Sequence, residues 1–194
     1  MDAAAPTAAP AEAPASAARE RILRTAHDLF YRDGIRATGI DRVIAESGVA
    51  KLTFYRHFPS KNDLVLAFLD YRHARWMEWF EDALRRHGGH TRALVPALAE
   101  WLRSEAYRGC AFINSVGELG ATLPEVNEIT RRHKQDMTEA IARLLPPCRQ
   151  RRQLAADLAT AVDGAIIRAQ FDADPKAALA SLERIRKALL ASVL

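Results

Sequence analysis

The segment from residue 51 to residue 57 combines hydrogen-bond donors with aromatic rings and contains no acidic residue. Phe54 and Phe58 stand at helical spacing and are expected to face inward, so the remaining side chains cannot all be buried. A short helix with such an outer face can enter the major groove of DNA and contact base edges. The alternative is a solvated amphipathic helix with half-buried Tyr and His. The expected DNA-contacting residues here are Lys51, Thr53, Tyr55, Arg56 and His57.

The charge of the surrounding chain favours DNA binding. Between residues 36 and 61 the basic residues are Arg36, Arg42, Lys51, Arg56 and Lys61, and the acidic ones are Asp41 and Glu46. A locally positive surface is attracted to the phosphate backbone. We therefore expect Arg42 and Lys61 to contact phosphates, with Thr38 at the same interface.

A second set of polar residues lies in an apolar segment from Gly109 to Leu119. Asn114 and Glu118 are four residues apart and so share one helical face, beside Ser115. Polar groups that face inward must be hydrogen-bonded, so these residues either tie neighbouring helices together or orient a ligand in a cavity. The expected pocket residues are Trp79, Phe80, Trp101, Cys110, Phe112, Asn114, Glu118 and His133.

Helical periodicity predicts the elements that position both sets. A first helix over residues 18–32 braces a pair of short helices around a corner at Gly48, a residue suited to the left-handed conformation of a helix end. Thr38 is expected to cap the second helix. Pro59 ends the third, and Ser60, with Asp63 in the capping-box position, begins a long helix over residues 61–86. Further helices are expected over residues 91–106, within 109–119, and over 122–145, 150–171 and 175–194.

The stretch Val-Ala-Lys-Leu-Thr-Phe-Tyr-Arg-His-Phe-Pro-Ser-Lys, residues 49–61, closely resembles the helix-turn-helix of the TetR family of bacterial repressors. The pattern from Arg21 to Thr38 is similar to the family's first helix and turn. The resemblance implies an all-α fold of nine helices, with an N-terminal three-helix head and a larger ligand-binding and dimerisation body. We assign residues 18–70 to the DNA-binding domain, residues 71–194 to the body, and the Ala/Pro-rich residues 1–17 to a disordered tail.

Two positions depart from the family's pattern. Leu52 stands where the family often has a small residue, so we expect it to contact a thymine methyl group or a sugar edge. Ala50 replaces the usual Ser or Thr cap, which costs roughly 1 kcal/mol of local helix stability.

Cys110 and His133 each allow two interpretations. Buried cysteine commonly packs as a small apolar residue. Alternatively, Arg108 could favour the thiolate of Cys110 and make it an electrophile sensor like those of some family members, although the sequence identifies no partner lysine. His133 lies on an apolar stripe, where it is either a hydrogen-bonded packing residue or a ligand contact.

The last two helices present more apolar surface than one body can cover. The simplest solution is an isologous contact with a second copy of the chain, as the family also implies. The expected interface residues are Leu154, Leu158, Val162, Ile166, Leu182, Ile185 and Leu189.

Composition limits the class of protein. A net charge of +4 and a pI near 9.3 permit a polyanionic partner. Two cysteines make no disulfide framework and fit a reducing cytoplasm. The chain shows no bilayer-spanning segment, catalytic constellation, cofactor motif or metal site. We therefore expect a transcriptional regulator, most simply a repressor released from a palindromic operator by a small molecule. A ligand-blind DNA-binding protein and a thiol- or histidine-based helical enzyme are the alternatives.

Overall fold

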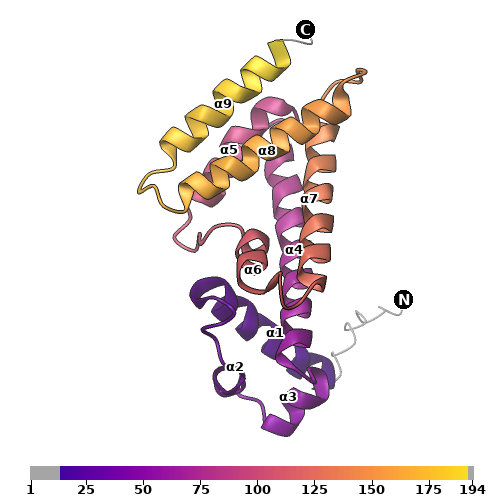
Figure 1. Cartoon of the computed structure of the whole chain (residues 1–194), viewed down its shortest axis with the longest axis vertical. Helices are drawn as coiled ribbons and strands as arrows, with labels where there is room; N and C mark the ends of the chain where they lie inside the picture. Colours follow the sequence, from indigo (N-terminus) through magenta and orange to yellow (C-terminus); the bar gives the residue numbers. More distant parts are fainter. Residues whose placement is uncertain (1–13, 192–194) are drawn as a thin grey trace, which may run out of the picture.

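The computed structural model describes residues 14–191, and within them the fold is all-α with nine helices, as predicted. The helices are α1 (Pro14–Asp33), α2 (Ile40–Ser47), α3 (Lys51–His57), α4 (Lys61–Arg86), α5 (Leu94–Leu102), α6 (Ala111–Leu119), α7 (Glu125–Arg143), α8 (Arg151–Ala169) and α9 (Lys176–Ala191), with a 3-10 turn (Thr91–Ala93) before α5. The molecule is elongated, with α2 and α3 at one end and α8 and α9 at the other (Figure 1).

The head consists of α1, α2 and α3, packed on the first half of α4. Its buried side chains include Leu29 from α1, Val43 from α2, and Phe54 and Phe58 from α3 and its end. Gly48 ends α2 with a φ of 63°, in the left-handed region that favours glycine. These residues hold α3 by its aromatic inner face and leave its outer face to solvent.

The two predicted caps around the helix-turn-helix have different outcomes. Ser60 caps α4 as expected, because its Oγ accepts a hydrogen bond from the Asp63 N–H at 3.1 Å. The Thr38 cap is wrong. The N-cap of α2 is Gly39, whereas the Thr38 hydroxyl donates to the Gly34 carbonyl at 2.8 Å. Thr38 is 0% exposed, so its side chain does not belong to the DNA-contacting surface.

Helix α4 joins the head to the body without a break. It has 26 residues, which corresponds to a length of roughly 39 Å. Its N-terminal half contributes Leu64 and Phe68 to the head core, and its C-terminal half contributes Trp76 and Phe80 to the body core. Because one apolar stripe of α4 packs in both cores, a displacement of α4 within the body also changes its packing contacts in the head.

Several helix boundaries differ from the predicted ones. Helix α1 begins at Pro14 rather than residue 18, and the rest of the expected tail, residues 1–13, lies outside the described residues. The predicted helix over residues 91–106 is a 3-10 turn followed by α5, which has only nine residues. Pro96 lies in the first turn of α5, where its missing N–H costs no helical hydrogen bond, so α5 cannot begin much earlier.

The interface residues expected on α8 and α9 need correction. Leu154, Leu158, Val162 and Ile166 are buried inside the protomer and do not line the outward groove, so they belong to the body core, whereas the buried Leu182 also lines the groove. The outward face of the pair carries small residues around a groove of about 360 Å³. Ile185 is 42% exposed at this groove, and Leu189 is half-buried. The groove residues on α8 and α9 are Thr160, Ala161, Gly164, Ala165, Arg168, Ala177, Ala178, Ser181, Leu182 and Ile185.

Candidate nucleic-acid interface

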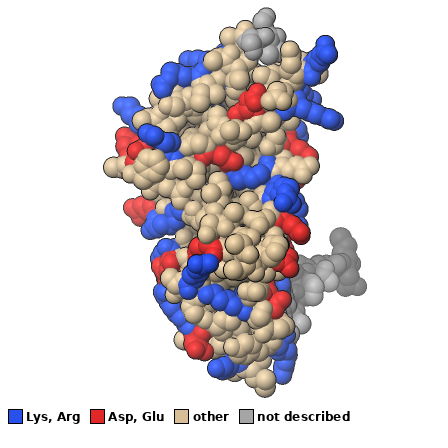
Figure 2. Space-filling view, in the orientation of Figure 1, with Lys and Arg blue, Asp and Glu red and all other residues tan. Residues whose placement is uncertain are grey.

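The outer face of α3 is a solvent-exposed set of donors and apolar groups at the tip of the head. Lys51, Tyr55 and Arg56 are exposed, and Thr53 and His57 are half-buried. Leu52 is 73% exposed and adds an apolar side chain to this face. In Figure 2, Lys and Arg side chains appear at the end of the molecule that carries α2 and α3. This face has the size and chemistry to enter a major groove.

The two cations expected at phosphates lie in different surroundings. Arg42 is held by two carboxylates, because its Nη1 lies 2.8 Å from Asp33 Oδ2 and its Nε lies 2.8 Å from Glu46 Oε1. A phosphate would have to compete with both. Lys61 is half-buried at the start of α4, and burial lowers the pKa of its ammonium below the ordinary value. Of these two cations, Lys61 is therefore the one for which a phosphate would meet less competition.

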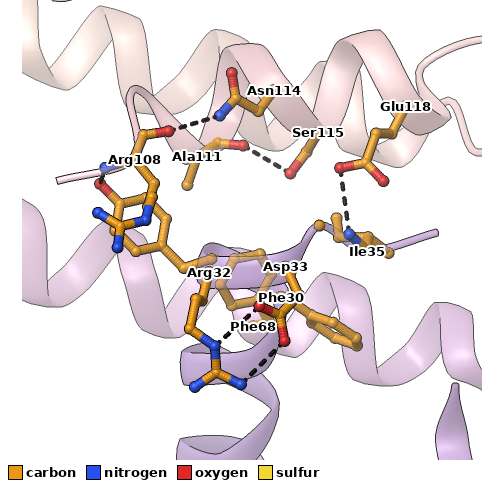
Figure 3. Close-up of a pocket in the computed structure, with 12 residues that line it drawn as sticks. Phe30, Arg32, Asp33, Ile35, Phe68, Arg108, Ala111, Asn114, Ser115 and Glu118 are labelled. Atoms are coloured by element: carbon orange, nitrogen blue, oxygen red, sulfur yellow. Dashed lines mark hydrogen bonds and ion pairs between the residues drawn. The ribbon is translucent and has the colours of Figure 1, made fainter. Parts of the chain in front are cut away.

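Asn114 and Glu118 lie at the junction between head and body rather than in the aromatic core of the body. Glu118 reaches from α6 to the turn after α1, where its carboxylate accepts a hydrogen bond from the backbone N–H of Ile35 at 3.2 Å (Figure 3). It accepts a second from the backbone N–H of Arg36 at 2.7 Å. Asn114 Nδ2 donates to the Arg108 carbonyl at 3.1 Å. Both residues line a cavity of about 270 Å³ beside α1. Both residues therefore connect segments of the chain and also line a cavity, but they do not converge with Trp79, Trp101 and His133 as expected.

Phe80, Cys110, Phe112 and His133 lie in a tightly filled body core, and the half-buried Trp79 and Trp101 lie beside it at an open groove. Phe80 stacks on Trp76 at 4.6 Å between ring centroids, and His133 stacks on Phe112 at 3.7 Å. The cavity among them measures about 10 Å³, room for roughly one water molecule. Burial lowers the pKa of His133 to about 2, so the ring is neutral at physiological pH. His133 is thus mainly a packing residue that also contacts His73, with 3.2 Å between their Nδ1 atoms.

Cys110 lies at the edge of this core, beside a lysine that the sequence did not identify. Its Sγ is 3.5 Å from Lys134 Nζ, and the same ammonium pairs with Asp163 at 2.5 Å. Cys110 is only 3% exposed. The structure therefore supplies the missing cation for a sensor cysteine but also encloses its thiol.

Comparison with known proteins identifies the head and then the whole chain. Residues 22–68 match the family model described as bacterial regulatory proteins, tetR family. The solved structure of a TetR-family transcriptional regulator from Streptomyces coelicolor is 32% identical in sequence, with a TM-score of 0.80, over 92% of this chain and 96% of that one. This chain belongs to the TetR family.

Two further relatives, both HTH-type transcriptional regulators, match this chain beyond its head. The HTH-type transcriptional regulator UidR of Escherichia coli is 22% identical over 183 residues, which cover 91% of this chain and 92% of UidR. A regulator encoded beside lacX in Lactococcus lactis is 26% identical over 129 residues, which span 64% of this chain and 66% of that protein. This TetR-family chain is a DNA-binding transcriptional regulator and not an enzyme, so the enzymatic alternative is wrong. Within residues 14–191, no helix is both long and apolar enough to cross a bilayer.

Three residues of the body and of its junction with the head were not singled out from the sequence. Arg72, on α4, lies over the Tyr31 ring at 4.0 Å. Tyr31 in turn donates its hydroxyl to the Gly109 carbonyl at 2.9 Å, which ties α1 to the loop before α6. Lys134 is the partner of Cys110 described above. The spacing of Arg72, four residues before Trp76, was a signal that it shares the aromatic face of α4.

The Glu118 contact yields a prediction about stability. Replacing Glu118 with Ala leaves two backbone N–H groups of the turn after α1 without their acceptor, so the free energy of unfolding should fall by about 1–3 kcal/mol. Urea denaturation followed by tryptophan fluorescence measures this change. Glu118→Gln, which keeps one side-chain acceptor, should lose less. Equal stability of the Ala variant and the unmodified protein would show that the contact contributes nothing.

Proposed function

We propose that this TetR-family regulator is a homodimeric repressor that binds a palindromic operator through α3 of both heads and is released by a small molecule bound in the body. The observation that carries the proposal is the outer face of α3, where exposed Lys51, Tyr55 and Arg56 project from a helix anchored by Phe54. A helix displayed in this way places base-reading groups at the tip of the molecule.

The outward face of α8 and α9 supports the dimer. Its groove is lined largely by alanine and Gly164, which allow helices of two copies to approach closely, and it includes the exposed Ile185. Pairing about a twofold axis at this face would place a second head beside the first at the far end of the molecule. Two heads related by twofold symmetry read two inverted half-sites, which is why a palindromic operator is expected.

Helix α4 and the Glu118 contact support release by an effector. A ligand between α4 and the other body helices can displace α4, and α4 also forms part of the head core. Glu118 adds a second connection, from α6 to the turn between α1 and α2. Small displacements in the body would therefore change the separation of two heads that must fit one operator.

Selection of bound DNA from a random pool tests the proposal, followed by gel shift on the enriched sequence. We expect an inverted repeat whose half-site centres are separated by one helical turn of DNA or a multiple of it. Binding of one protomer to a single half-site with undiminished affinity would contradict the dimeric mode. Enrichment of no sequence at all would contradict specific operator recognition and favour the ligand-blind alternative.

A second candidate is release by electrophiles through Cys110. The observation that favours it is the Lys134 ammonium 3.5 Å from Cys110 Sγ, because a neighbouring cation stabilises a thiolate. The thiolate would add to the double bond of a maleimide, which forms a carbon–sulfur bond, and the other alkene carbon would take up a proton. The low exposure of Cys110 opposes such a reaction in the closed protein.

The two roles of Cys110 are distinguished by operator release with N-ethylmaleimide. If Cys110 is a sensor, the reagent should weaken operator binding by the unmodified protein at least about tenfold and leave Cys110→Ser unaffected. Cys148→Ser is the matched control, because Cys148 is the other cysteine of the chain and is half-buried. Equal responses of the unmodified protein and Cys110→Ser would assign Cys110 to packing alone.

A further inference from the structure

A groove between α4 and the end of α5 combines tryptophan rings with arginines on one side of the body. Its volume is about 400 Å³, within the range of pockets that hold small molecules. The α4 residues lie at steps of three and four along the helix and therefore share one face. The groove is lined by Arg72, Arg75, Trp76, Trp79, Glu100, Trp101 and Ser104.

No carboxylate within residues 14–191 forms an ion pair with Arg72 or Arg75. Arg72 Nη1 lies 3.3 Å from His27 Nε2, and the guanidinium lies over the Tyr31 ring. His27 Nδ1 is 2.8 Å from an Asp28 oxygen, so its proton resides there and Nε2 is left as the acceptor for Arg72. Arg75 Nη1 donates to the Tyr71 hydroxyl at 2.9 Å. Burial holds the pKa of Arg72 below its ordinary value, which reflects an incompletely compensated charge.

The carboxylate of Glu100 does not neutralise these arginines, although it lines the same groove. Both of its oxygens are bound by Arg86, at 2.9 Å each, and one of them also lies 2.6 Å from His87 Nε2. These partners lower the pKa of Glu100 to about 2. Because Glu100 is already paired outside the groove, the groove is cationic.

Trp76 also lines this groove. The residue is 6% exposed, and its Nε1 has no hydrogen-bond partner. Trp79 and Trp101 stand 6.0 Å apart, centroid to centroid, and provide ring surfaces at the same groove.

We propose that this groove binds an aromatic organic anion, with its carboxylate on Arg72 and Arg75 and its ring against the tryptophans. The inference rests on the proposed function, because it gives the chemical class of the effector. Through Arg72, binding of this anion in the body would change a contact with the head. A carboxylate that draws its guanidinium away from Tyr31 and His27 removes a contact between α4 and α1. Tyr31 also donates its hydroxyl to the Gly109 carbonyl in the loop before α6, so the same residue contacts the body at two points.

Isothermal titration calorimetry with benzoate, 1-naphthoate and indole-3-acetate, and with the neutral amide of each, tests the proposal. At least one acid should bind, and its amide should bind at least about tenfold more weakly, since a hydrogen bond to a charged group is lost. Arg72→Gln and Arg75→Gln should each weaken binding of the acid by about tenfold or more. Arg75 is exposed, so its variant should fold normally and tests the groove even if the Arg72 variant misfolds. Arg85→Gln, an exposed arginine of α4 outside the groove, should bind like the unmodified protein.

The outcomes separate this proposal from the proposed function. Equal binding of acid and amide, full binding by both groove variants, or no binding of any acid would overturn it. Gel shift on the selected operator without ligand tests the repressor itself, and it is unaffected by a failure of the groove proposal. The acid that binds should also release operator from the unmodified protein but not from Arg72→Gln. Binding without release would overturn the link through Arg72.

Discussion

Ile185→Glu should convert the regulator into monomers at micromolar concentration and weaken operator binding by about 10²–10⁴-fold. Ile185 is the exposed large apolar residue of the groove on α8 and α9, and a glutamate there would have to lose its hydration to enter a close helical interface. A monomer retains one head, and the gain from linking two heads on one DNA molecule is of the stated size. Light scattering and gel shift measure the two effects.

Lys187→Glu is the matched control for this dimer prediction. It also introduces a glutamate on α9, but two residues further along, which turns it about 200° away from Ile185. Lys187 is 69% exposed and does not line the groove. This variant should remain a dimer that binds operator. A dimeric Ile185→Glu protein with unaltered affinity would show that the two copies meet elsewhere.

Arg56→Ala should weaken binding of the selected operator by about 1–3 kcal/mol per head if the guanidinium contacts a guanine, and so by about 2–6 kcal/mol for the dimer. Arg56 is exposed on the outer face of α3, and no ion pair within the described residues occupies its guanidinium. The loss should be selective, because a base-reading contact contributes only when the matching base is present. Titration against operators changed at single base pairs measures both the size and the selectivity.

Lys61→Ala separates base reading from phosphate binding. A phosphate contact is independent of sequence, so this variant should weaken all operators alike and reduce the dependence of log affinity on log salt concentration by about one per head. Arg85→Ala, at the far end of α4, is the control for a general loss of positive charge. Unaltered affinity in both the Arg56 and the Lys61 variants would exclude the assigned orientation of α3 on DNA.

The head was largely predictable from the sequence because its boundaries are set by local signals. Gly48, Pro59 and Ser60 each fix the end or the start of a helix through their own conformational preferences, and α3 and α4 have the predicted bounds. Thr38 was an exception. A threonine before a helix can cap it or bond backward to the preceding turn, and here the backward bond to Gly34 forms.

The body was less predictable because periodicity shows that a residue is buried but not what covers it. Leu154 and Leu158 have the spacing of a buried face, but that face is covered by the protomer itself rather than by a second copy. Asn114 and Glu118 do share a helical face, yet that face meets the head and lines a cavity at the junction with α1 rather than one inside the body. Lys134 is 24 residues from Cys110, and no local pattern connects two residues at that separation. The roles expected for the DNA-contacting and effector-binding residues stay predictions.

The contact made by Glu118 has a consequence for how such regulators can diverge. The carboxylate binds backbone N–H groups of residues 35 and 36, so the head contributes no particular side chain to this connection. Substitutions in the head that alter operator preference therefore leave the connection intact, provided that the turn keeps its path. New DNA specificities can therefore arise in α3 while this connection to the body stays unchanged.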